Sequence, residues 1–253
     1  FVIDQATKDR LIAEDPRSAE LIKPFAQGRD IKRYAQIPIK QYLILIPNGW
    51  TNQHRKGNAW NWFATQYPAI ARHLKQFEKE AIARGDKGDY WWELRACEYY
   101  DEFEKPKIVY PNILKQPEFT FDQTGIYTNQ KCFIIPSDDL YLLGILNSSV
   151  SMFLFTQMFP KLRGDFYGPS WVFFQNFPIH VIDPSNATEV QQRDQIISLV
   201  GKMLELHKYN PTTPQEKDQL DRTIQATAKF VDNLVAYHYG LIDEDVRILK
   251  TTT

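Results

Sequence analysis

The chain has 253 residues, of which 43% are hydrophobic and 24% are charged, and these ordinary globular values exclude a disordered or fibrous protein. The formal net charge is −1, which excludes a uniformly basic nucleic-acid binder. This length suits one large domain or two modest ones.

The first third of the chain predicts two helices and one strand around an exposed loop. Residues 4–15 predict a short helix, which an Asp-Pro step ends. Residues 42–46 (YLILI) are a compact apolar run that predicts a buried strand. Residues 48–62 are polar, aromatic and Gly-bearing, and they predict an exposed loop. Residues 68–85 predict a helix with a single apolar stripe. The stripe consists of Ile70, Leu74, Phe77 and Ala81.

The middle of the chain predicts a sheet covered by an apolar helix. Short apolar runs bounded by turn residues are typical of strands. The predicted strands are 107–111, 119–122, 131–136, 171–174 and 179–183. Residues 122–125 predict a hairpin-type connection between the second and third of these strands. Residues 138–158 predict a helix that is buried against the sheet.

The C-terminal part predicts two amphipathic helices of similar length, within residues 190–210 and 212–240. Thr213 and Glu216 form a capping box at the start of the second helix, and Gly240 is a typical C-cap residue. Because the connection between the two helices is short, we expect an antiparallel pair.

These elements predict an α+β fold. A mixed α/β body is expected over residues 1–183, followed by an antiparallel helical hairpin over residues 184–253.

Cysteine usage and hydropathy bear on the compartment. Cys97 and Cys132 show no paired metal-binding pattern, which fits a reducing compartment. No run approaches the ~20 apolar residues of a membrane span, and no signal peptide is visible. We therefore expect a cytoplasmic protein without a membrane partner. Because the chain begins with Phe1 rather than Met, we expect it to be part of a longer protein.

Charge is distributed unevenly along the chain. Residues 21–77 contain nine cations and one acid, a net charge of +8, whereas residues 183–253 contain eight cations and eleven acids, a net charge of −3. The first segment would attract a polyanion. The alternative is that two solvated faces happen to carry unequal charge.

Three basic groups and one aromatic motif (YWWELR, 90–95) make candidate contacts to double-stranded DNA. Lys and Arg neutralise phosphates, Arg pairs with guanine, and aromatic rings stack on bases. The first group is Arg29, Lys32 and Arg33, the second is Arg55 and Lys56, and the third is Lys161 and Arg163 with Tyr167 beside them. The aromatic motif contributes Trp92 and Arg95. Two alternatives remain open. Tryptophans of the motif can pack in the core, and Arg29 or Arg33 can pair with Asp30 and brace the fold.

Catalytic motifs are missing from the sequence. It contains no GxxxxGK[ST], GxGxxG, GxSxG or HExxH pattern and no Glu-x-Lys step. We therefore expect no catalytic, metal-binding or cofactor-binding residue in this chain. Two alternatives to DNA binding are a protein-interaction module that docks through the helical hairpin and a divergent nuclease that uses Asp30. The acidic stretch 98–104 could hold a metal or simply be a solvated surface.

Four segments in order resemble the C-terminal specificity region of TaqI-like and Eco57I-like adenine-specific DNA methyltransferases. The segments are residues 1–34, 90–113, 124–150 and 224–249, which begin FVIDQATKDR, YWWELRACEYY, TGIYTNQKCF and IQATAKFVDN. The resemblance as a whole extends over nearly the whole chain, from the first of these segments to the last. GRDIKRY (28–34) and KLRGDFYGPSW (161–171) match family positions in the recognition region.

The resemblance implies sequence-specific DNA target recognition for a type IIG-like restriction-modification protein of bacterial defence that methylates adenine N6. It implies that the methyltransferase domain, with its S-adenosylmethionine, lies elsewhere in the parent chain and is a partner of this one. The parent could also cleave DNA. On this reading residues 1–183 recognise DNA, and residues 184–253 are a spacer or docking segment.

Overall fold

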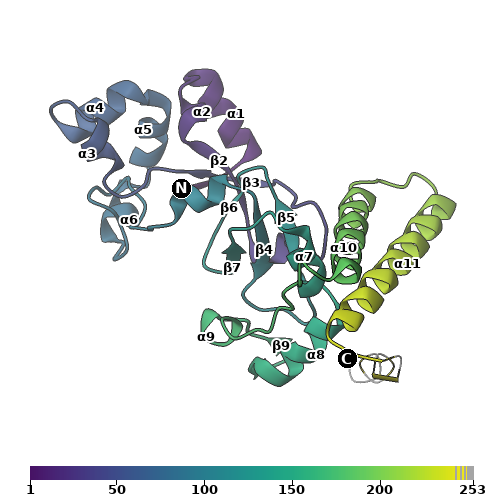
Figure 1. Ribbon diagram of the computed structural model, residues 1–253. Helices are drawn as coiled ribbons and strands as arrows, with labels where there is room; N and C mark the ends of the chain where they lie inside the picture. Colours follow the sequence, from purple (N-terminus) through teal and green to yellow (C-terminus); the bar gives the residue numbers. More distant parts are fainter. Residues whose placement is uncertain (243, 246, 248, 250–253) are drawn as a thin grey trace. The chain divides into compact units, whose positions relative to one another are not determined.

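The computed structural model describes residues 1–242, 244, 245, 247 and 249. Helices and short strands form a mixed α+β fold that ends in helices, as predicted (Figure 1). The chain divides into two compact units that are each built from separate segments. Unit 1 contains Phe1–Ala26, Pro38–Lys105 and Gln123–Thr128. Unit 2 contains Gln27–Ile37, Pro106–Asp122 and the described residues from Asn129 onward.

This division does not coincide with the predicted boundary between residues 183 and 184, because the C-terminal helices belong to the same unit as much of the preceding body. As a division between functions that boundary stays a prediction, and residues 243, 246, 248 and 250–253 of its second part lie outside the described residues.

Unit 1 contains a four-stranded sheet of order β1-β3-β2-β6. Its strands are β1 Val2–Asp4, β2 Ile22–Ala26, β3 Gln41–Ile44 and β6 Tyr127–Thr128. β3 confirms the strand predicted at 42–46, and it pairs antiparallel with β1 and β2. β6 adds parallel to β2, from a segment a hundred residues later in the chain, which no local pattern predicts.

Unit 1 also contains short helices. They are α1 Gln5–Glu14, α2 Ser18–Leu21, α3 Trp50–His54, α4 Ala59–Gln66, α5 Pro68–Lys75, α6 Glu78–Ala83 and the 3-10 helix η2 Tyr100–Glu104. Of these, α1 and α2 contact the sheet directly. α1 confirms the first predicted helix, and it begins at Asp4, whose carboxylate accepts a hydrogen bond from the backbone N–H of Thr7.

Two predictions for unit 1 are wrong. Residues 48–62 are not a loop, since they hold α3 and the start of α4. The side chain of Asn58 caps α4 by accepting from the N–H of Asn61, and Phe63 is buried one turn later. The single helix predicted over 68–85 is broken near Phe77, whose side chain is 50% exposed and does not continue the buried stripe.

Unit 2 contains a three-stranded antiparallel sheet of order β5-β4-β7. Its strands, β4 Lys107–Pro111, β5 Thr120–Asp122 and β7 Cys132–Ile135, confirm three predicted strands. The hairpin predicted between β5 and β7 is wrong, because these strands lie on opposite sides of β4. Lys107 and Asp122 form an ion pair within the sheet, with side chains that are 0% and 3% exposed.

Around this sheet lie a small hairpin and two short helical turns. They are β8 Lys161–Leu162, β9 Phe166–Tyr167, α9 Trp171–Phe174 and the 3-10 helix η1 Gly28–Asp30. The strand predicted at 171–174 is wrong: the carbonyl of Ser170 accepts from the N–H groups of Phe173 and Phe174 and closes a helical turn. Residues 179–183, also predicted as a strand, have no regular secondary structure.

The remaining helices of unit 2 are α7 Leu140–Leu146, α8 Ser149–Met158, α10 Ala187–Leu206 and α11 Pro214–His238. The helix predicted over 138–158 is two helices, because the side chain of Ser148 caps a new helix by accepting from the N–H of Ser151. α7 and α8 meet at 60°. In the described part of the chain no single helix is long and apolar enough to cross a membrane, and this bent pair meets the criterion by length and composition alone.

α10 and α11 form the predicted antiparallel pair (Figure 1). The capping box of Thr213 and Glu216 is present, and Gly240 follows the second helix with φ +68°. α7 packs closely against α10 because Gly144 carries no side chain. A Cβ atom there would lie 2.7 Å from Ile196 Cγ2.

Candidate nucleic-acid interface

The basic segment 28–34 (GRDIKRY) begins with η1, which lies at the C-terminal end of β4. η1 packs beside this end so closely that a Cβ atom on Gly28 would lie 2.8 Å from the carbonyl oxygen of Lys131 and 3.5 Å from Pro111 Cβ. Arg29 is exposed, and no described residue is its partner. This close approach is between Gly28 and the backbone of Lys131, an exposed cation outside the three predicted basic groups.

The other residues of this segment have partners. The carboxylate of Asp30 accepts from the backbone N–H of Gln27 at 3.0 Å, so it caps its own turn rather than holding the neighbouring arginines. The ammonium of Lys32 lies 2.8 Å from a carboxylate oxygen of Glu118, with the lysine side chain 58% exposed. These contacts engage Asp30 structurally and leave Lys32 accessible.

Arg33 turns inward. Its guanidinium lies 5.4 Å from the centre of the Tyr34 ring, and its positive charge adds to burial in lowering the pKa of His207. Tyr34 is 1% exposed with φ +57°, and burial raises its pKa to about 12. Arg33 therefore packs beside Tyr34 and His207 instead of pairing with Asp30, and its role as a DNA contact stays a prediction.

The β8–β9 hairpin carries a second basic group. Lys161 and Asp165 form an ion pair of 2.8 Å, which raises the pKa of the lysine and lowers that of the carboxyl group. Arg163 is exposed and has no partner among the described side chains. The ammonium of Lys115 lies 4.9 Å above the Phe166 ring. Its positive charge also helps to lower the pKa of Asp165, the residue before Phe166. Sequence reasoning also missed Lys115.

Backbone contacts connect the two basic groups. The N–H of Asn112, just after β4, donates to the carbonyl of Lys131 at 2.9 Å, and Leu114 exchanges two backbone hydrogen bonds with Tyr167. The segments that follow and flank β4 thus converge at one end of the sheet. We call the cations on them the β4-end cations: Arg29, Lys115, Lys131, Lys161 and Arg163.

Two aromatic candidates are corrected by burial. Tyr167 is 8% exposed and belongs to the core of unit 2. Trp92 is 3% exposed, stacks on Tyr90 with ring centres 4.5 Å apart, and donates its indole N–H to Thr51 Oγ1 at 3.0 Å. Neither ring is available for stacking on a base, so both are withdrawn from the candidate contacts.

The YWWELR motif is structural for a further reason. The carboxylate of Glu93, which is 0% exposed, accepts from the backbone N–H groups of Gly49 and Thr51 at the start of α3, at 3.2 Å and 2.9 Å. The motif therefore fixes the position of a helix that sequence reasoning took for a loop. Arg95, at the end of the motif, is exposed.

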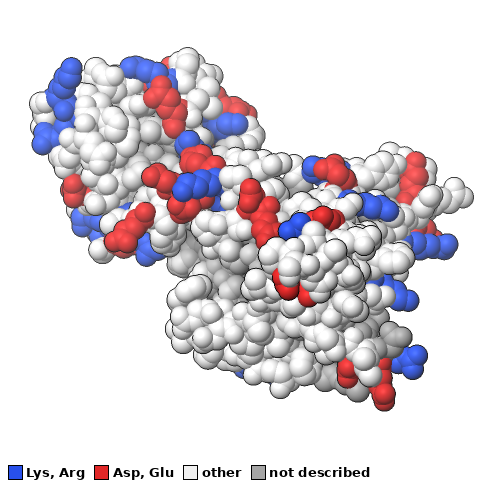
Figure 2. Space-filling view, viewed as in Figure 1, with Lys and Arg blue, Asp and Glu red and all other residues white. Residues whose placement is uncertain are grey.

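Unit 1 presents its own cations between α3 and α4. Arg55 donates from Nε to Asn52 Oδ1 at 2.8 Å and from its guanidinium to the carbonyl of Gly57, which fixes its direction. Lys56 is exposed. Basic side chains are visible over this part of unit 1 in Figure 2.

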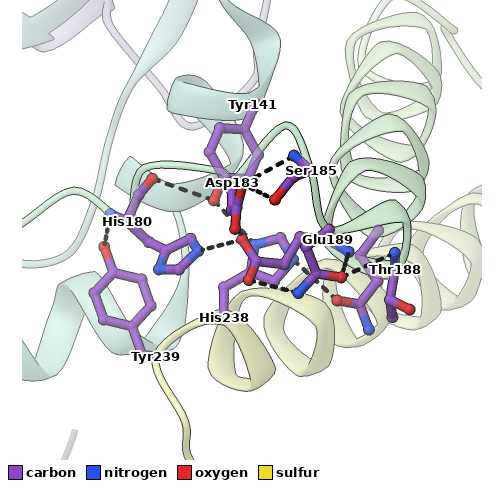
Figure 3. A network of polar contacts seen from close by, with 10 residues as sticks. Tyr141, His180, Asp183, Ser185, Thr188, Glu189, His238 and Tyr239 are labelled. Carbon is purple, nitrogen blue, oxygen red and sulfur yellow. Dashed lines mark hydrogen bonds and ion pairs between the residues drawn. The ribbon is translucent and has the colours of Figure 1, made fainter.

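A polar network, shown in Figure 3, joins the segment after α9 to α10, α11 and α7. His180 donates from Nε2 to Glu189 at 3.2 Å, and His238 contacts Gln192 Oε1 and the Tyr141 hydroxyl at 3.2 Å and 2.9 Å. Burial, and then the nearby His180, lower the pKa of His238. A neutral His238 that donates to Gln192 and accepts from Tyr141 satisfies both contacts.

The acidic stretch 98–104 is divided among separate contacts. Glu104 lies 3.1 Å from the Lys23 ammonium and accepts from the Tyr127 hydroxyl, while Glu102 pairs with Lys105. Within the described residues, no group of three or more His, Cys, Asp or Glu side chains has the arrangement of a metal site.

Comparisons with known proteins point to one family. The family model of the TaqI-like C-terminal specificity domain matches residues 23–179. The chain is also similar to the solved structure of the Type IIL restriction-modification enzyme MmeI in complex with DNA, with a TM-score of 0.69 and 14% sequence identity. The likeness covers 98% of this chain and 32% of MmeI, so the chain spans a minor part of that enzyme's length. At this identity the likeness shows a shared fold. No curated protein matches the sequence.

Proposed function

The chain belongs to the family of TaqI-like C-terminal specificity domains, and from this membership we propose that it recognises a target sequence in double-stranded DNA for a restriction-modification protein. The observation that carries the proposal is the convergence of the β4-end cations on a chain whose net charge is −1. Clustered cations supply affinity for phosphates even where the whole chain is not basic.

The β4-end cations differ in how readily they can contact DNA. Arg29 and Arg163 are exposed and have no described partner, so they can bind phosphate or the edge of a guanine without giving up another contact. Lys161 must exchange Asp165 for a phosphate. Exposed ion pairs contribute little to stability, so this exchange costs little. Lys32 must likewise exchange its ion pair with Glu118 for a contact with a phosphate.

The parent protein is proposed to be a type IIG-like enzyme that methylates adenine at N6. Its methyltransferase domain and S-adenosylmethionine would lie outside this chain, and the enzyme would act on DNA in the cytoplasm. The support is the family membership together with the fold shared with MmeI, a restriction-modification enzyme solved in complex with DNA. In this arrangement the chain selects the site and the remainder of the parent performs the chemistry.

A docking role for the helical hairpin is the second candidate. Phe230 and Tyr237 on α11 are 63% and 58% exposed, although large aromatic side chains are usually at least half buried. Such exposed rings on a long helix suit a protein contact. The methyltransferase domain of the parent is the partner that this reading proposes.

Binding of duplex DNA by charge-reversal variants tests the first proposal. Arg29→Glu/Arg163→Glu is expected to weaken binding and to reduce the slope of log K against log salt by about 1.8, which is 0.9 for each phosphate contact. The matched control is Lys202→Glu/Lys229→Glu, which reverses two exposed charges on α10 and α11. Equal effects of the two double variants, measured by fluorescence anisotropy, would contradict a localised interface.

A further inference from the structure

The surface beside the β8–β9 hairpin is unusually apolar. Trp171 and Val172, at the start of α9, are 68% and 67% exposed, and Leu162 of β8 is 39% exposed. Tryptophan is rarely this exposed in a soluble protein. Figure 2 shows no Lys, Arg, Asp or Glu side chains over the surface at α9.

The exposed side chains are held rigidly from behind. Phe174, on the other side of the α9 turn, packs against Phe159 and Phe177 with ring centres 5.8 Å and 5.3 Å apart. Phe177 is 8% exposed and belongs to the core of unit 2. Since the inner face of this turn is anchored in the core, Trp171 and Val172 are presented outward on a fixed support.

The hairpin and the α9 turn form one surface. Leu162 pairs with Phe166 across the hairpin, so both side chains lie on the same face. Leu162 Cδ1 lies 3.6 Å from the position that a Cβ atom on Gly168 would occupy, and Gly168 accepts a hydrogen bond from Ser170, the residue before α9. The apolar surface therefore runs from the hairpin onto the start of α9.

Cations adjoin this apolar surface. Lys161 and Arg163 are the sequence neighbours of Leu162, and the Lys115 ammonium lies 4.9 Å above the Phe166 ring. The carboxylate of Asp165, on the hairpin turn, is engaged by Lys161. Duplex DNA matches this pairing of charge and apolarity, because phosphates flank stacked bases that an apolar side chain can separate.

We propose that Trp171 and Val172 form an apolar wedge that inserts between two base pairs of the target, while Lys161 and Arg163 bind the flanking phosphates. This inference rests on the proposed function and deepens it by naming how the site deforms its DNA. Insertion unstacks one base step and bends the duplex. Pyrimidine–purine steps unstack most easily, so the wedge contributes a preference for a flexible step such as TpA without a hydrogen bond to a base.

The test uses short duplexes with one TpA step and 2-aminopurine in place of its adenine, whose fluorescence rises on unstacking. Binding is followed on the same samples by anisotropy. Wild-type chain is expected to raise the 2-aminopurine signal. Trp171→Ala/Val172→Ala should abolish the rise and weaken binding roughly 5- to 150-fold, as for loss of one aromatic–base stack. Trp171→Phe should keep the rise. Phe230→Ala, which removes an equally exposed ring from α11, is the control and should change neither signal.

The outcomes separate the wedge from the proposed function. DNA binding without a 2-aminopurine rise at any position of the modified base, or an unchanged rise with the double alanine variant, overturns the wedge and leaves DNA binding standing. Absence of any DNA binding by the folded wild-type chain overturns both. If sedimentation shows a wild-type dimer that Trp171→Ala/Val172→Ala converts to a monomer, the surface joins two copies of the chain, and the wedge is overturned.

Discussion

Replacing Lys107 with Met is expected to destabilise unit 2 strongly. Lys107 on β4 lies opposite Asp122 on β5, and both side chains are essentially inaccessible to solvent, at 0% and 3% exposed. Without the lysine, the Asp122 carboxylate stays in the sheet and loses its cation. Breaking a buried ion pair from one side costs about 3–5 kcal/mol, a large share of the ~5–15 kcal/mol that stabilises a typical domain.

The double variant Lys107→Met/Asp122→Leu separates a cost of broken pairing from a cost of lost packing. With both charges removed, most of the lost stability should return, because the sheet no longer buries a charge. Lys161→Met is the matched control: its ion pair with Asp165 has side chains 62% and 77% exposed, so its loss should leave the unfolding curve unchanged.

Urea unfolding followed by far-UV circular dichroism measures these effects, since α10 and α11 are the longest helices described and belong to unit 2. A Lys107→Met curve that overlays the wild-type curve would refute the reasoning. So would a double variant as unstable as the single one, which would place the cost in packing rather than in the broken ion pair.

Three further predictions concern local contacts. Gly28→Ala should lower the free energy of unfolding in urea by about 1–3 kcal/mol and weaken DNA binding, because its Cβ would lie 2.8 Å from the Lys131 carbonyl. The control is Gly201→Ala in α10, where no atom lies within 4 Å of the added Cβ, and this variant should be neutral or stabilising. Glu93→Gln should cost about 1.5–3 kcal/mol by weakening the charged hydrogen bonds to α3, seen in thermal unfolding followed by Trp fluorescence, since five of the six tryptophans lie in unit 1. The pKa of His238 is lowered in the folded chain, so below about pH 6.5 the unfolded chain binds a proton at this histidine more readily than the folded chain does. The free energy of unfolding should therefore fall as the pH drops through that value. The urea midpoint of wild type is measured across this pH range and compared with that of His238→Gln, in which the loss should be smaller. An identical pH dependence would contradict the role of His238.

The elements that sequence reasoning predicted correctly are those with local signals. Thr213 and Glu216 cap α11 through contacts within four residues of each other, so the pattern and the structure agree. The helix over 138–158 was predicted as continuous because its apolar run is unbroken, yet Ser148 at the junction caps α8, and this serine was the available signal. The strand predicted at 171–174 is wrong because an apolar run of four residues does not distinguish a strand from a short helical turn.

The interleaving of the two units could not be predicted from local patterns. β6 joins β2 across a hundred residues, and such pairings depend on contacts that no short window contains. The same limit explains why Lys115 and Lys131 were missed. Neither lies in a basic run, and each belongs to the β4-end cations only through a backbone contact, Leu114 with Tyr167 and Gly28 with Lys131. Trp92 is a candidate from the sequence because two tryptophans beside Arg95 are typical of a surface that stacks on bases. The burial of Trp92 and Glu93, which only the structure shows, excludes that role for Trp92.

Selection of a randomised DNA duplex pool by the 253-residue chain at two salt concentrations, followed by sequencing, tests target recognition most directly. We expect an enriched short motif that persists at the higher salt, and loss of that enrichment in Arg29→Glu/Arg163→Glu. Retention without enrichment that vanishes at the higher salt would contradict target recognition and leave only phosphate affinity. Absence of retention at both salt concentrations would contradict DNA binding itself.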